Sequence, residues 1–527
     1  MKRAFFIILS VLIMASCRQE PVTLCVLETT DLHGEVGAPM SKVAEYIRVA
    51  YKEYGDNLIL LDGGDNFQGS PEVFYSNYVD TLNPHIYRQI FNMLPYSAIA
   101  VGNHDFEVGR KVYERVYGKI KVPVLCANIV YTKSKKPCFQ PYAIIRKKGY
   151  KIAILGLVTP YALNWLPANL RKGMSFVSID ESAEKWVDHI QKRERPDLII
   201  GLFHTGNGKT NIDSASWEAE NIPGIDLICC GHIHNANLEQ IIDRGGDTTK
   251  IINAGSKAEY IAKAIVSITP VDGAAPKIDI STELIKTDTL SRRNREYDEM
   301  IIPFMEKAKA YYDVPVCEFD TTIYSKDALK GPCGWTDFLH KSYKKITRTM
   351  GYTGSREVGV TIVAPSSEAV LHKGQLTIRD FIMLYPHEDK LSIVEMTGLE
   401  IKDYLEYVYS RPTDNPNMPI YEFDSASGVD YSVDTTQSYG NRVTIYSMYS
   451  GNKFYPDRRY LVAMNSFRAA GGGGHLGYGL GWNPEKIKAR ILNESSRSIR
   501  AMMMDIYSSE PIDVTPEATW KFEQQPE

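Results

Sequence analysis

The sequence lacks several features that would assign it to a familiar class of protein. Lys and Arg together number 60 against 64 Asp and Glu, which leaves a formal net charge of −4 and no basic surplus. Because binding to nucleic acid depends on Lys and Arg that neutralise phosphates, this balance argues against a sequence-specific nucleic-acid binder. The eight cysteines include no Cys-x-x-Cys pair of the kind found in zinc sites, and no internal repeat of solenoid length is present. The composition is that of an ordinary globular protein, with 44% hydrophobic and 24% charged residues.

No hydrophobic run is long enough to span a membrane. The apolar run at the start of the chain resembles the signal peptide of a bacterial lipoprotein. Two basic residues precede an apolar run from Ala4 to Met14, which is too short to span a membrane, and the segment ends in Ala15-Ser16-Cys17. The resemblance implies that Cys17 becomes the lipidated first residue of the mature protein, anchored outside the cytoplasm and facing the periplasm or the cell surface. The alternatives are a secretory signal cleaved nearby and an N-terminal anchor that stays attached.

The other cysteines have two possible fates. Four of them fall in apolar runs and are expected to be buried as small hydrophobic residues, namely Cys25, Cys126, Cys229 and Cys230. Cys317 and Cys333 could pair in an oxidising compartment or stay reduced, and the sequence does not decide between these states.

The length of 527 residues predicts two to four domains, because a domain holds roughly 100–200 residues. From Val22 onward, short runs rich in Val, Ile and Leu alternate with stretches that are helical or loop-like, which is typical of sheets covered on both faces. We therefore expect an α/β domain over residues 22–288. A charged amphipathic stretch predicts a linker helix over 289–312, followed by a second α/β domain over 313–510 and a flexible tail over 511–527.

Polar residues follow the apolar runs of the first domain at the points where strands are expected to end. Five of these runs lead to the segments Asp31-Leu32-His33, Gly63-Gly64-Asp65, Gly102-Asn103-His104, His204-Thr205-Gly206 and Gly231-His232-Ile233-His234. One Asp or His after a strand is usually a helix cap or a solvated loop residue. Five together favour a shared site at the carboxyl edge of a sheet, where ligands of α/β proteins bind.

Carboxylate, imidazole and Asn oxygen ligands in one cluster suit a divalent ion such as Zn, Mn, Co or Fe. The candidate ligands are too many for one ion and comprise Asp31, His33, Asp65, Asn103, His204, His232 and His234. Two ions about 3.5–4 Å apart can hold a hydroxide and clamp the attacking and leaving oxygens of a phosphoryl transfer. The sequence therefore predicts a centre with two metal ions.

The five segments, in this order and spacing, resemble those of the calcineurin-like metallophosphoesterases. Within that superfamily the chain is similar to the family of 5'-nucleotidases and 2',3'-cyclic phosphodiesterases. The resemblance implies a four-layer α/β/β/α sandwich that holds the two metals, followed by an α/β 5'-nucleotidase C-terminal domain that binds the nucleoside. It also implies that the chain is a phosphoric ester hydrolase acting on nucleotides.

The resemblance assigns a role to each residue of the metal centre. It implies that Asp65 bridges the metals, and that the two sites are completed by Asp31, His33 and His234 and by Asn103, His204 and His232. It implies further that His104 contacts the phosphoryl oxygens and stabilises their charge or protonates the leaving oxygen. Many relatives orient this histidine with an Asp three residues later, where this chain has Glu107, so Glu107 either supports His104 or is a solvated loop charge.

In the second domain, the resemblance implies that two aromatic rings sandwich the base. Phe423 looks like the first and Phe467 like the second, beside Gly471 and Gly472, and such stacking is worth roughly 1–3 kcal/mol per base. The alternative is that both are core phenylalanines.

Two departures from the 5'-nucleotidase pattern bear on the substrate. Gly473 stands where many 5'-nucleotidases have an Asp that binds the ribose hydroxyls, and Phe467-Arg468-Ala469 looks more like the branch acting on 2',3'-cyclic nucleotides and 3'-nucleotides. We therefore favour that branch and a role in nucleotide scavenging. A 5'-nucleotidase or UDP-sugar hydrolase is the alternative among enzymes, and a surface lipoprotein that binds nucleotides without hydrolysing them is the alternative from another class.

Overall fold

The computed structural model describes residues 20–161, 166, 170–206, 214–386, 388–414, 418–515, 517 and 519–523. The predicted signal peptide and its lipidation site Cys17 lie outside the described residues. The chain divides into two compact units, one made of Met1–Pro160 and Lys172–Met305 and the other of Tyr161–Arg171 and Glu306–Glu527.

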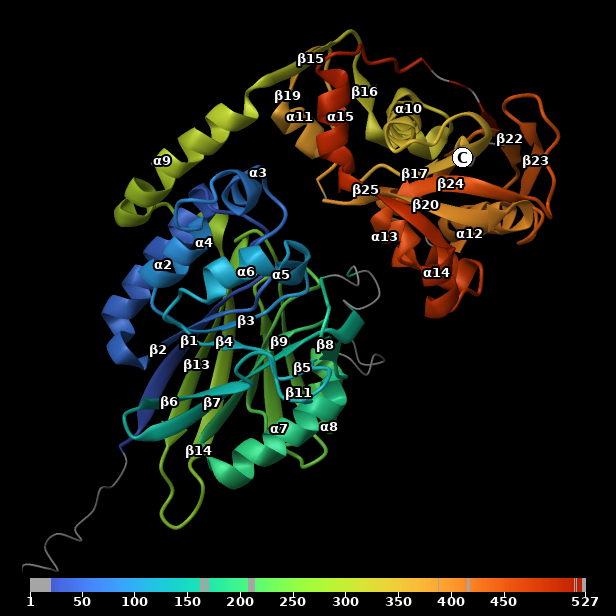
Figure 1. Ribbon diagram of the computed structural model, residues 1–527. Coiled ribbons are helices and arrows are strands. Elements are labelled where there is room, and N and C mark those ends of the chain that lie inside the picture. Colours follow the sequence, from blue (N-terminus) through green and yellow to red (C-terminus); the bar gives the residue numbers. More distant parts are fainter. Residues whose placement is uncertain are drawn as a thin grey trace, which may run out of the picture. The chain divides into compact units, whose positions relative to one another are not determined.

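Two six-stranded sheets form the centre of the first unit (Figure 1). The first has the order β14 (Lys277–Lys286), β13 (Tyr260–Thr269), β1 (Val22–Thr29), β2 (Leu58–Asp62), β3 (Tyr96–Ala100) and β4 (Val124–Leu125). The second has the order β11 (Asn237–Ile242), β12 (Thr248–Asn253), β10 (Leu227–Cys230), β9 (Leu198–His204), β7 (Tyr150–Val158) and β6 (Tyr142–Lys147). Because β1 to β3 are mutually parallel, and β9 is parallel to β10, the carboxyl ends of each set share one edge of their sheet.

Strand β7 shows why these runs are apolar at most positions. Its residues Ile152 and Ile154 belong to the core that also contains residues of the first sheet, while Ala153 and Leu155 belong to a second core that includes helix α7. Side chains of a strand alternate between faces, so a strand covered on both faces needs apolar residues throughout.

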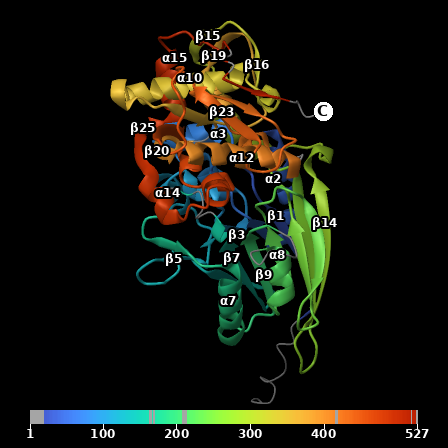
Figure 2. The ribbon, with the colours of Figure 1, turned by 90° about the vertical axis from the view of Figure 1, so that its right-hand side faces the viewer.

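Helices cover the outer faces of both sheets. Helix α2 (Ala38–Tyr54) contacts β1 and β2, and α7 (Ile179–Arg193) and α8 (Ala215–Asn221) contact strands of the second sheet (Figure 1, Figure 2). The layers are thus α/β/β/α, which confirms the predicted fold class. The remaining elements of this unit are α3 (Pro71–Phe74), α4 (Ile86–Met93), α5 (His104–Glu107), α6 (Arg110–Tyr117), β5 (Ile129–Tyr131) and β8 (Met174–Phe176).

The second unit is built on a five-stranded sheet with a core on each face. The strand order is β21 (Ser425–Ser427), β17 (Val360–Val363), β24 (Arg459–Asn465), β20 (Lys390–Thr397) and β25 (Ile491–Ser498). One core joins Leu391 and Ile393 of β20 to helix α10 (Gly334–Thr349), and the other joins Val394 and Met396 to helix α12 (Gly398–Asp414). This confirms a second α/β domain.

Shorter elements complete the second unit. They are β15 (Pro315–Phe319), β16 (Ile323–Tyr324), β18 (Val370–Leu371), β19 (Gly374–Thr377), α11 (Ile378–Leu384), α13 (Ser466–Ala469), η8 (Gly472–Gly474), η9 (His475–Gly479), α14 (Pro484–Arg490) and α15 (Ile499–Tyr507). A separate three-stranded sheet has the order β23 (Val443–Met448), β22 (Val429–Val433) and β26 (Trp520–Phe522).

Two observations bear on the linker and the tail expected from the sequence. Helix α9 (Arg295–Tyr312) begins later than the predicted linker, and the division between the units falls inside it, after Met305. The tail expected to be flexible contains β26, in which Trp520 is 5% exposed and stacks on Tyr431 with the ring centroids 5.5 Å apart. Burying this large apolar side chain provides the free energy that orders the segment.

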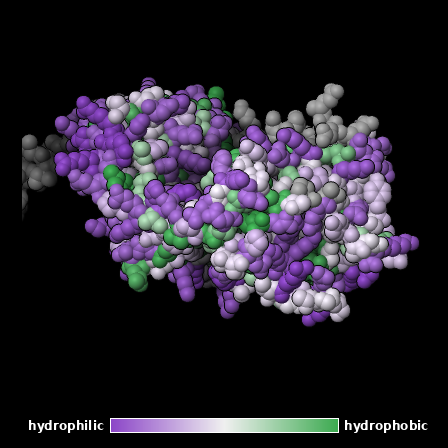
Figure 3. Space-filling view, turned by 90° about the horizontal axis from the view of Figure 1, so that it is seen from above, coloured by the Kyte–Doolittle hydropathy of each residue, from purple (hydrophilic) through white to green (hydrophobic). Residues whose placement is uncertain are grey.

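Within the described residues, the structure has neither a membrane-spanning helix nor a disulfide bond. Hydrophilic side chains cover most of the face drawn in Figure 3, with hydrophobic ones in small groups among them. No described helix is long and apolar enough to cross a bilayer. All seven described cysteines are free, including Cys317 and Cys333, and the four expected in the core are buried.

Candidate active site

The predicted ligands of the first unit lie at or just beyond the carboxyl ends of β1, β2, β3, β9 and β10. Five of them have a left-handed backbone, with φ of 49° at Asp31, 47° at His33, 59° at Asp65, 77° at His232 and 54° at His234. Such φ values are uncommon for residues with a side chain, and strained backbone clusters at functional sites. The described chain has ten non-glycine residues of this kind, so half of them fall on this one site.

The first ligand group consists of Asp31, His33 and His234, whose candidate ligand atoms lie within 4.8 Å of one another. The Nε2 atom of His234 is 3.4 Å from Oδ1 of Asp31, and the Nε2 atoms of His33 and His234 are 2.8 Å apart. Two imidazole nitrogens directed at each other beside a carboxylate form a natural cradle for a cation.

The second ligand group consists of Asp65, His204 and His232, again within 4.8 Å. The Nε2 atom of His204 is 3.0 Å from Oδ2 of Asp65 and 3.1 Å from Oδ1 of Asn103, so the predicted Asn ligand lies at the same place. The two groups adjoin, because the same Nε2 atom is 4.0 Å from Oδ1 of Asp31. The seven predicted ligands therefore lie close together, and the assignment of each to a metal ion, with Asp65 between the two ions, stays a prediction.

Each carboxylate of the site directs one oxygen to hydrogen-bond donors of the protein and the other toward histidine nitrogens of the site. Oδ2 of Asp31 accepts hydrogen bonds from the Thr30 hydroxyl at 2.7 Å and from the backbone N–H of His232 at 2.9 Å, and Oδ1 of Asp65 accepts from the backbone N–H of His104 at 2.7 Å. The other two oxygens are buried and face imidazoles, with Oδ1 of Asp31 3.4 Å from Nε2 of His234 and Oδ2 of Asp65 3.0 Å from Nε2 of His204. Buried carboxylate oxygens and imidazole nitrogens directed at one another are a donor set that fits metal ions.

Backbone carbonyls orient two of the histidines toward these oxygens. Nδ1 of His204 lies 2.7 Å from the carbonyl oxygen of Gly63, and Nδ1 of His33 lies 3.1 Å from that of Gln68. A proton on Nδ1 donated to the carbonyl leaves the Nε2 lone pair directed at the site, which is how metal-binding histidines are usually held.

Electrostatics keeps the two aspartates ionised. Burial raises the pKa of Asp31 and of Asp65, but the histidines around them, His204 above all, outweigh burial and hold both pKa values below the usual range. The site therefore presents negative charge to a ligand.

His104 and Glu107 form a pair next to the ligand groups, at the two ends of the short helix α5. Nδ1 of His104 is 3.0 Å from Oε2 of Glu107, and both side chains are partly exposed. Burial lowers the pKa of His104, yet the carboxylates of Glu107 and Asp65 outweigh it and raise the pKa to about 10. The longer arm of Glu107 thus reaches the histidine, and the geometry places a protonated imidazole beside the metal groups.

Asp105 is a residue of the site whose role the sequence did not indicate. Its buried carboxylate accepts backbone N–H bonds from Gly102, Asp65 and Asn66 at 2.9–3.1 Å, and the hydroxyl of Tyr117 donates to it at 2.8 Å. It therefore ties the loop after β2 to the loop after β3. The only sequence signal for it is its place next to His104.

The two loops approach so closely that side chains are excluded from their glycines. A Cβ atom on Gly102 would lie 2.1 Å from Oδ1 of Asp65, and one on Gly64, where φ is 92°, would lie 2.5 Å from the backbone nitrogen of Gly102. These glycines let the Asp65 and Asn103 loops pack together.

In the second unit, the two aromatic residues predicted to bind the base differ in exposure. Phe467 lies in α13, is partly exposed and packs on Gly472, while Gly471 precedes it in the same turn with a φ of 99°. Phe423 is 3% exposed and packs edge-to-face on Tyr409 in the core, with centroids 5.5 Å apart. A buried ring offers no open face to a base, so Phe423 has here the position of the alternative, a core phenylalanine.

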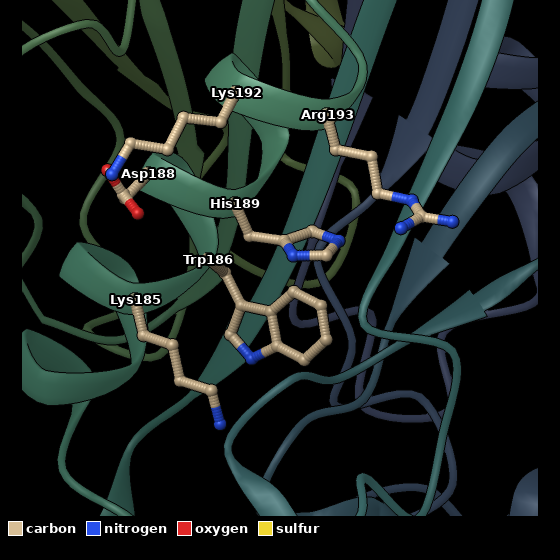
Figure 4. Close-up of a pocket in the computed structure, with 6 residues that line it drawn as sticks. All are labelled: Lys185, Trp186, Asp188, His189, Lys192 and Arg193. Atoms are coloured by element: carbon tan, nitrogen blue, oxygen red, sulfur yellow. The ribbon is translucent and has the colours of Figure 1, made fainter.

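A surface pocket elsewhere on the first unit contains neither of the two metal-ligand groups. It is lined by side chains of a single helix, α7, which are Lys185, Trp186, Asp188, His189, Lys192 and Arg193 (Figure 4). It shares no residue with the two metal-ligand groups.

Comparison with known proteins agrees with the site. Residues 26–236 match the model of the calcineurin-like phosphoesterase family, and residues 314–478 match that of the 5'-nucleotidase C-terminal domain. The chain thus has a calcineurin-like phosphoesterase domain followed by a 5'-nucleotidase C-terminal domain. Divalent metal ions are the cofactors of this family, in agreement with the two ligand groups.

Curated relatives of this phosphoesterase carry two kinds of name. A 2',3'-cyclic-nucleotide 2'-phosphodiesterase/3'-nucleotidase from Salmonella typhimurium is 24% identical over 88% of this chain and 84% of its own. A 5'-nucleotidase from Vibrio parahaemolyticus is 25% identical over 88% of each chain.

Solved structures share the fold of this phosphoesterase at lower identity. The 5'-nucleotidase precursor from Thermus thermophilus has a TM-score of 0.68 and 19% identity, with coverage of 96% of this chain and 100% of its own. A structure from Staphylococcus aureus has a TM-score of 0.79 and 18% identity over 95% of this chain and 100% of its own.

Proposed function

We propose that this chain hydrolyses phosphoesters of nucleotides with two divalent metal ions, Zn, Mn, Co or Fe, as cofactors. The observation that carries the proposal is the pair of adjoining ligand groups, in each of which a buried carboxylate oxygen and imidazole nitrogens are directed at one another. Asp31, His33 and His234 would hold one ion, Asn103, His204 and His232 the other, and Asp65 would reach both. When bound, such ions supply Lewis acidity at the phosphoryl group and lower the pKa of water.

The residues of the chain then have the following tasks. His104 binds the phosphoryl oxygens or donates a proton to the leaving oxygen, because its protonated ring keeps Nε2 as a donor while Nδ1 faces Glu107. Glu107 orients the ring and favours its charged form. Phe467, with Gly471 and Gly472 beside it, offers a partly exposed aromatic ring for a base.

Within this reaction class we propose the 2',3'-cyclic-nucleotide 2'-phosphodiesterase and 3'-nucleotidase activity. The Phe467-Arg468-Ala469 pattern and Gly473 support it, and so does a relative of that name in Salmonella typhimurium. The alternative activity, that of a 5'-nucleotidase or UDP-sugar hydrolase, draws support from the relative in Vibrio parahaemolyticus.

The test is a comparison of 2',3'-cyclic AMP, 3'-AMP, 5'-AMP and UDP-glucose as substrates of purified protein, with the bound metals quantified in the same preparation. We expect about two metal ions per chain and the highest kcat/KM for the cyclic nucleotide. Preference for 5'-AMP would reverse the choice of substrate. Binding of nucleotide without turnover in the metal-loaded protein would favour the non-catalytic surface lipoprotein.

We propose further that the protein is lipid-anchored through Cys17 outside the cytoplasm, where it releases nucleosides and phosphate for uptake. The basic and apolar residues before Cys17 support this. The domains would then be the phosphoesterase domain over 22–288, the linker over 289–312 and the nucleoside-binding domain over 313–510. Growth with radiolabelled palmitate should label the wild-type protein and leave Cys17→Ala unlabelled, and an unlabelled wild type would contradict the anchor.

A further inference from the structure

A buried cluster of charged residues lies behind the glycine turn of the second unit. Asp424, Arg468 and His475 are 1%, 3% and 0% exposed. Oδ2 of Asp424 is 3.0 Å from Nε of Arg468 and 2.9 Å from Nε2 of His475. Burial raises the pKa of Asp424, but Arg468 and His475 outweigh it and lower the pKa, so the carboxylate is held ionised between two basic groups.

Arg468 links two separate segments of the chain. Its guanidinium donates from Nη2 to the carbonyl of Tyr421, from Nη1 to the carbonyl of Gly472 at 3.3 Å, and from Nε to Asp424. The planar fork of an arginine makes these bonds from three separate nitrogen atoms, whereas all donors of a lysine sit on one nitrogen. The segment 421–424 and the turn at Gly472 are therefore joined through one side chain.

The same side chain lies against the ring of Phe467. The central carbon of the Arg468 guanidinium is 5.4 Å from the centroid of that ring, which is within the range of a cation–π contact. Gly472 lies against the ring as well, because a Cβ on it would fall 2.5 Å from Phe467 Cε2. The orientation of the Phe467 ring thus depends on Arg468 and on the turn that Arg468 holds.

His475 and the absence of a side chain on Gly473 fix the rest of the turn. His475 stacks on Tyr404 of α12 with the ring centroids 5.0 Å apart. A Cβ on Gly473, where φ is 72°, would lie 2.3 Å from Nη1 of Arg468. Arg468 occupies the space that a side chain at position 473 would need.

We infer that Arg468, held by Asp424 and His475, is a positioning residue that presents the Phe467 ring and the Gly471–Gly474 turn to the nucleoside part of the substrate. The inference rests on the proposed function, since it assigns the support of the base-binding ring in that reaction. A buried ion pair adds little stability compared with apolar residues of the same volume, so its presence behind an exposed aromatic ring fits a role in fixing geometry.

The test compares a substrate with a base and one without. Arg468→Met and Asp424→Asn are assayed on 2',3'-cyclic AMP and on bis(p-nitrophenyl) phosphate, which has no nucleoside. We expect KM for the cyclic nucleotide to rise roughly tenfold, the loss that follows when a stacking partner is misplaced, while kcat and the turnover of the base-free ester stay within about twofold. Arg468→Lys, which keeps the charge without the fork, should lie between the wild type and Arg468→Met.

Glu406→Gln is the matched control. Glu406 is also buried, at 1% exposure, and its carboxylate accepts backbone N–H bonds from Gly440, Arg442 and Val443, outside the glycine turn. This variant should lose thermal stability as the others do and keep the wild-type KM. If Arg468→Met does not fold, Gly473→Ala keeps Asp424, Arg468 and His475, displaces the guanidinium and should raise KM in the same way.

The outcomes separate the inference from the proposed function. A wild-type protein that cleaves the base-free ester and no nucleotide would overturn the proposed function, and the inference with it. A wild-type protein that cleaves the cyclic nucleotide, with variants whose KM is unchanged or rises equally on both substrates, would overturn the inference alone.

Discussion

The two candidate binding regions of this chain are organised in opposite ways. In the first unit, the buried carboxylates of Asp31 and Asp65 face histidine nitrogens in two groups of candidate metal ligands, and the backbone around them is strained. In the second unit, the buried carboxylate of Asp424 pairs with Arg468 and lies against His475. The first region thus consists of groups that can bind a metal ion, while in the second the carboxylate is paired with an arginine, which is not a metal ligand. The difference indicates that the first region is suited to binding a charged cofactor. The second region is suited to fixing the positions of its own side chains.

The largest expected effect comes from Asp65, the residue proposed to reach both metal ions. Asp65→Asn should lower kcat/KM for a cyclic nucleotide by on the order of 10³-fold, because it removes the charge shared by both groups. Folding should persist, since the amide of Asn has the size of the carboxylate and its oxygen can still accept from the backbone N–H of His104. Activity assays, metal analysis and circular dichroism check this, and a variant with wild-type activity would contradict the two-metal centre.

The same comparison shows which parts of the molecule the sequence could predict. Apolar runs ending in Asp, Asn or His led to the layered fold and to the seven candidate ligands, because strand periodicity and strand ends are local properties. Whether Glu107 reaches His104 was open, and the structure measures 3.0 Å between them; the role of Glu107 in catalysis stays a prediction.

Features that depend on distant pairing were not predicted. Asp424 meets Arg468 across 44 residues, and Trp520 stacks on Tyr431 from a tail whose composition suggests flexibility. Phe423 matched the pattern of a base-binding aromatic, yet Tyr409 of α12 covers its ring. Local sequence does not indicate which side chain from another element packs on a given ring.

Metal binding should stabilise one region and leave the other unchanged. A ligand that binds only the folded state raises stability by RT ln(1 + [L]/Kd), about 2.7 kcal/mol at a hundredfold excess over Kd. We expect Mn²⁺ added to chelator-treated protein to raise the melting temperature of the first unit alone, monitored by calorimetry. Trp520→Ala, which removes a core contact of the second unit, should lower only the other transition. A metal shift of both transitions would contradict the contrast between the regions.

The support of His104 should have an intermediate effect. Glu107→Gln keeps the hydrogen-bonding shape but removes the charge that favours the imidazolium, so kcat should fall roughly 10–100-fold with little change in KM, as for other residues that orient a functional histidine. Because Glu107 raises the pKa of His104, the variant should also lose activity at a lower pH than the wild type as the pH rises. Profiles of rate against pH for the two proteins measure the pH at which activity is lost. Superimposable profiles would show that Glu107 is only a loop charge.

The smallest expected effect concerns His85 of the first unit, which lies outside the metal site and has protein contacts at both ring nitrogens. His85 is fully buried; its Nδ1 accepts from the backbone N–H of Tyr87 at 3.1 Å, and its Nε2 lies 2.8 Å from Oδ1 of Asn77. Burial, with a contribution from Arg115, lowers the pKa of His85 to about 3. The folded state therefore keeps His85 neutral while the unfolded chain binds a proton below about pH 6.5, so its contribution to stability is present above that pH and is lost as the pH falls toward 3. Between pH 7 and pH 5 the loss from this one group should be about 2 kcal/mol, and His85→Gln should remove it from the urea unfolding free energy. An equal pH dependence in both proteins would show that His85 is protonated in the folded state.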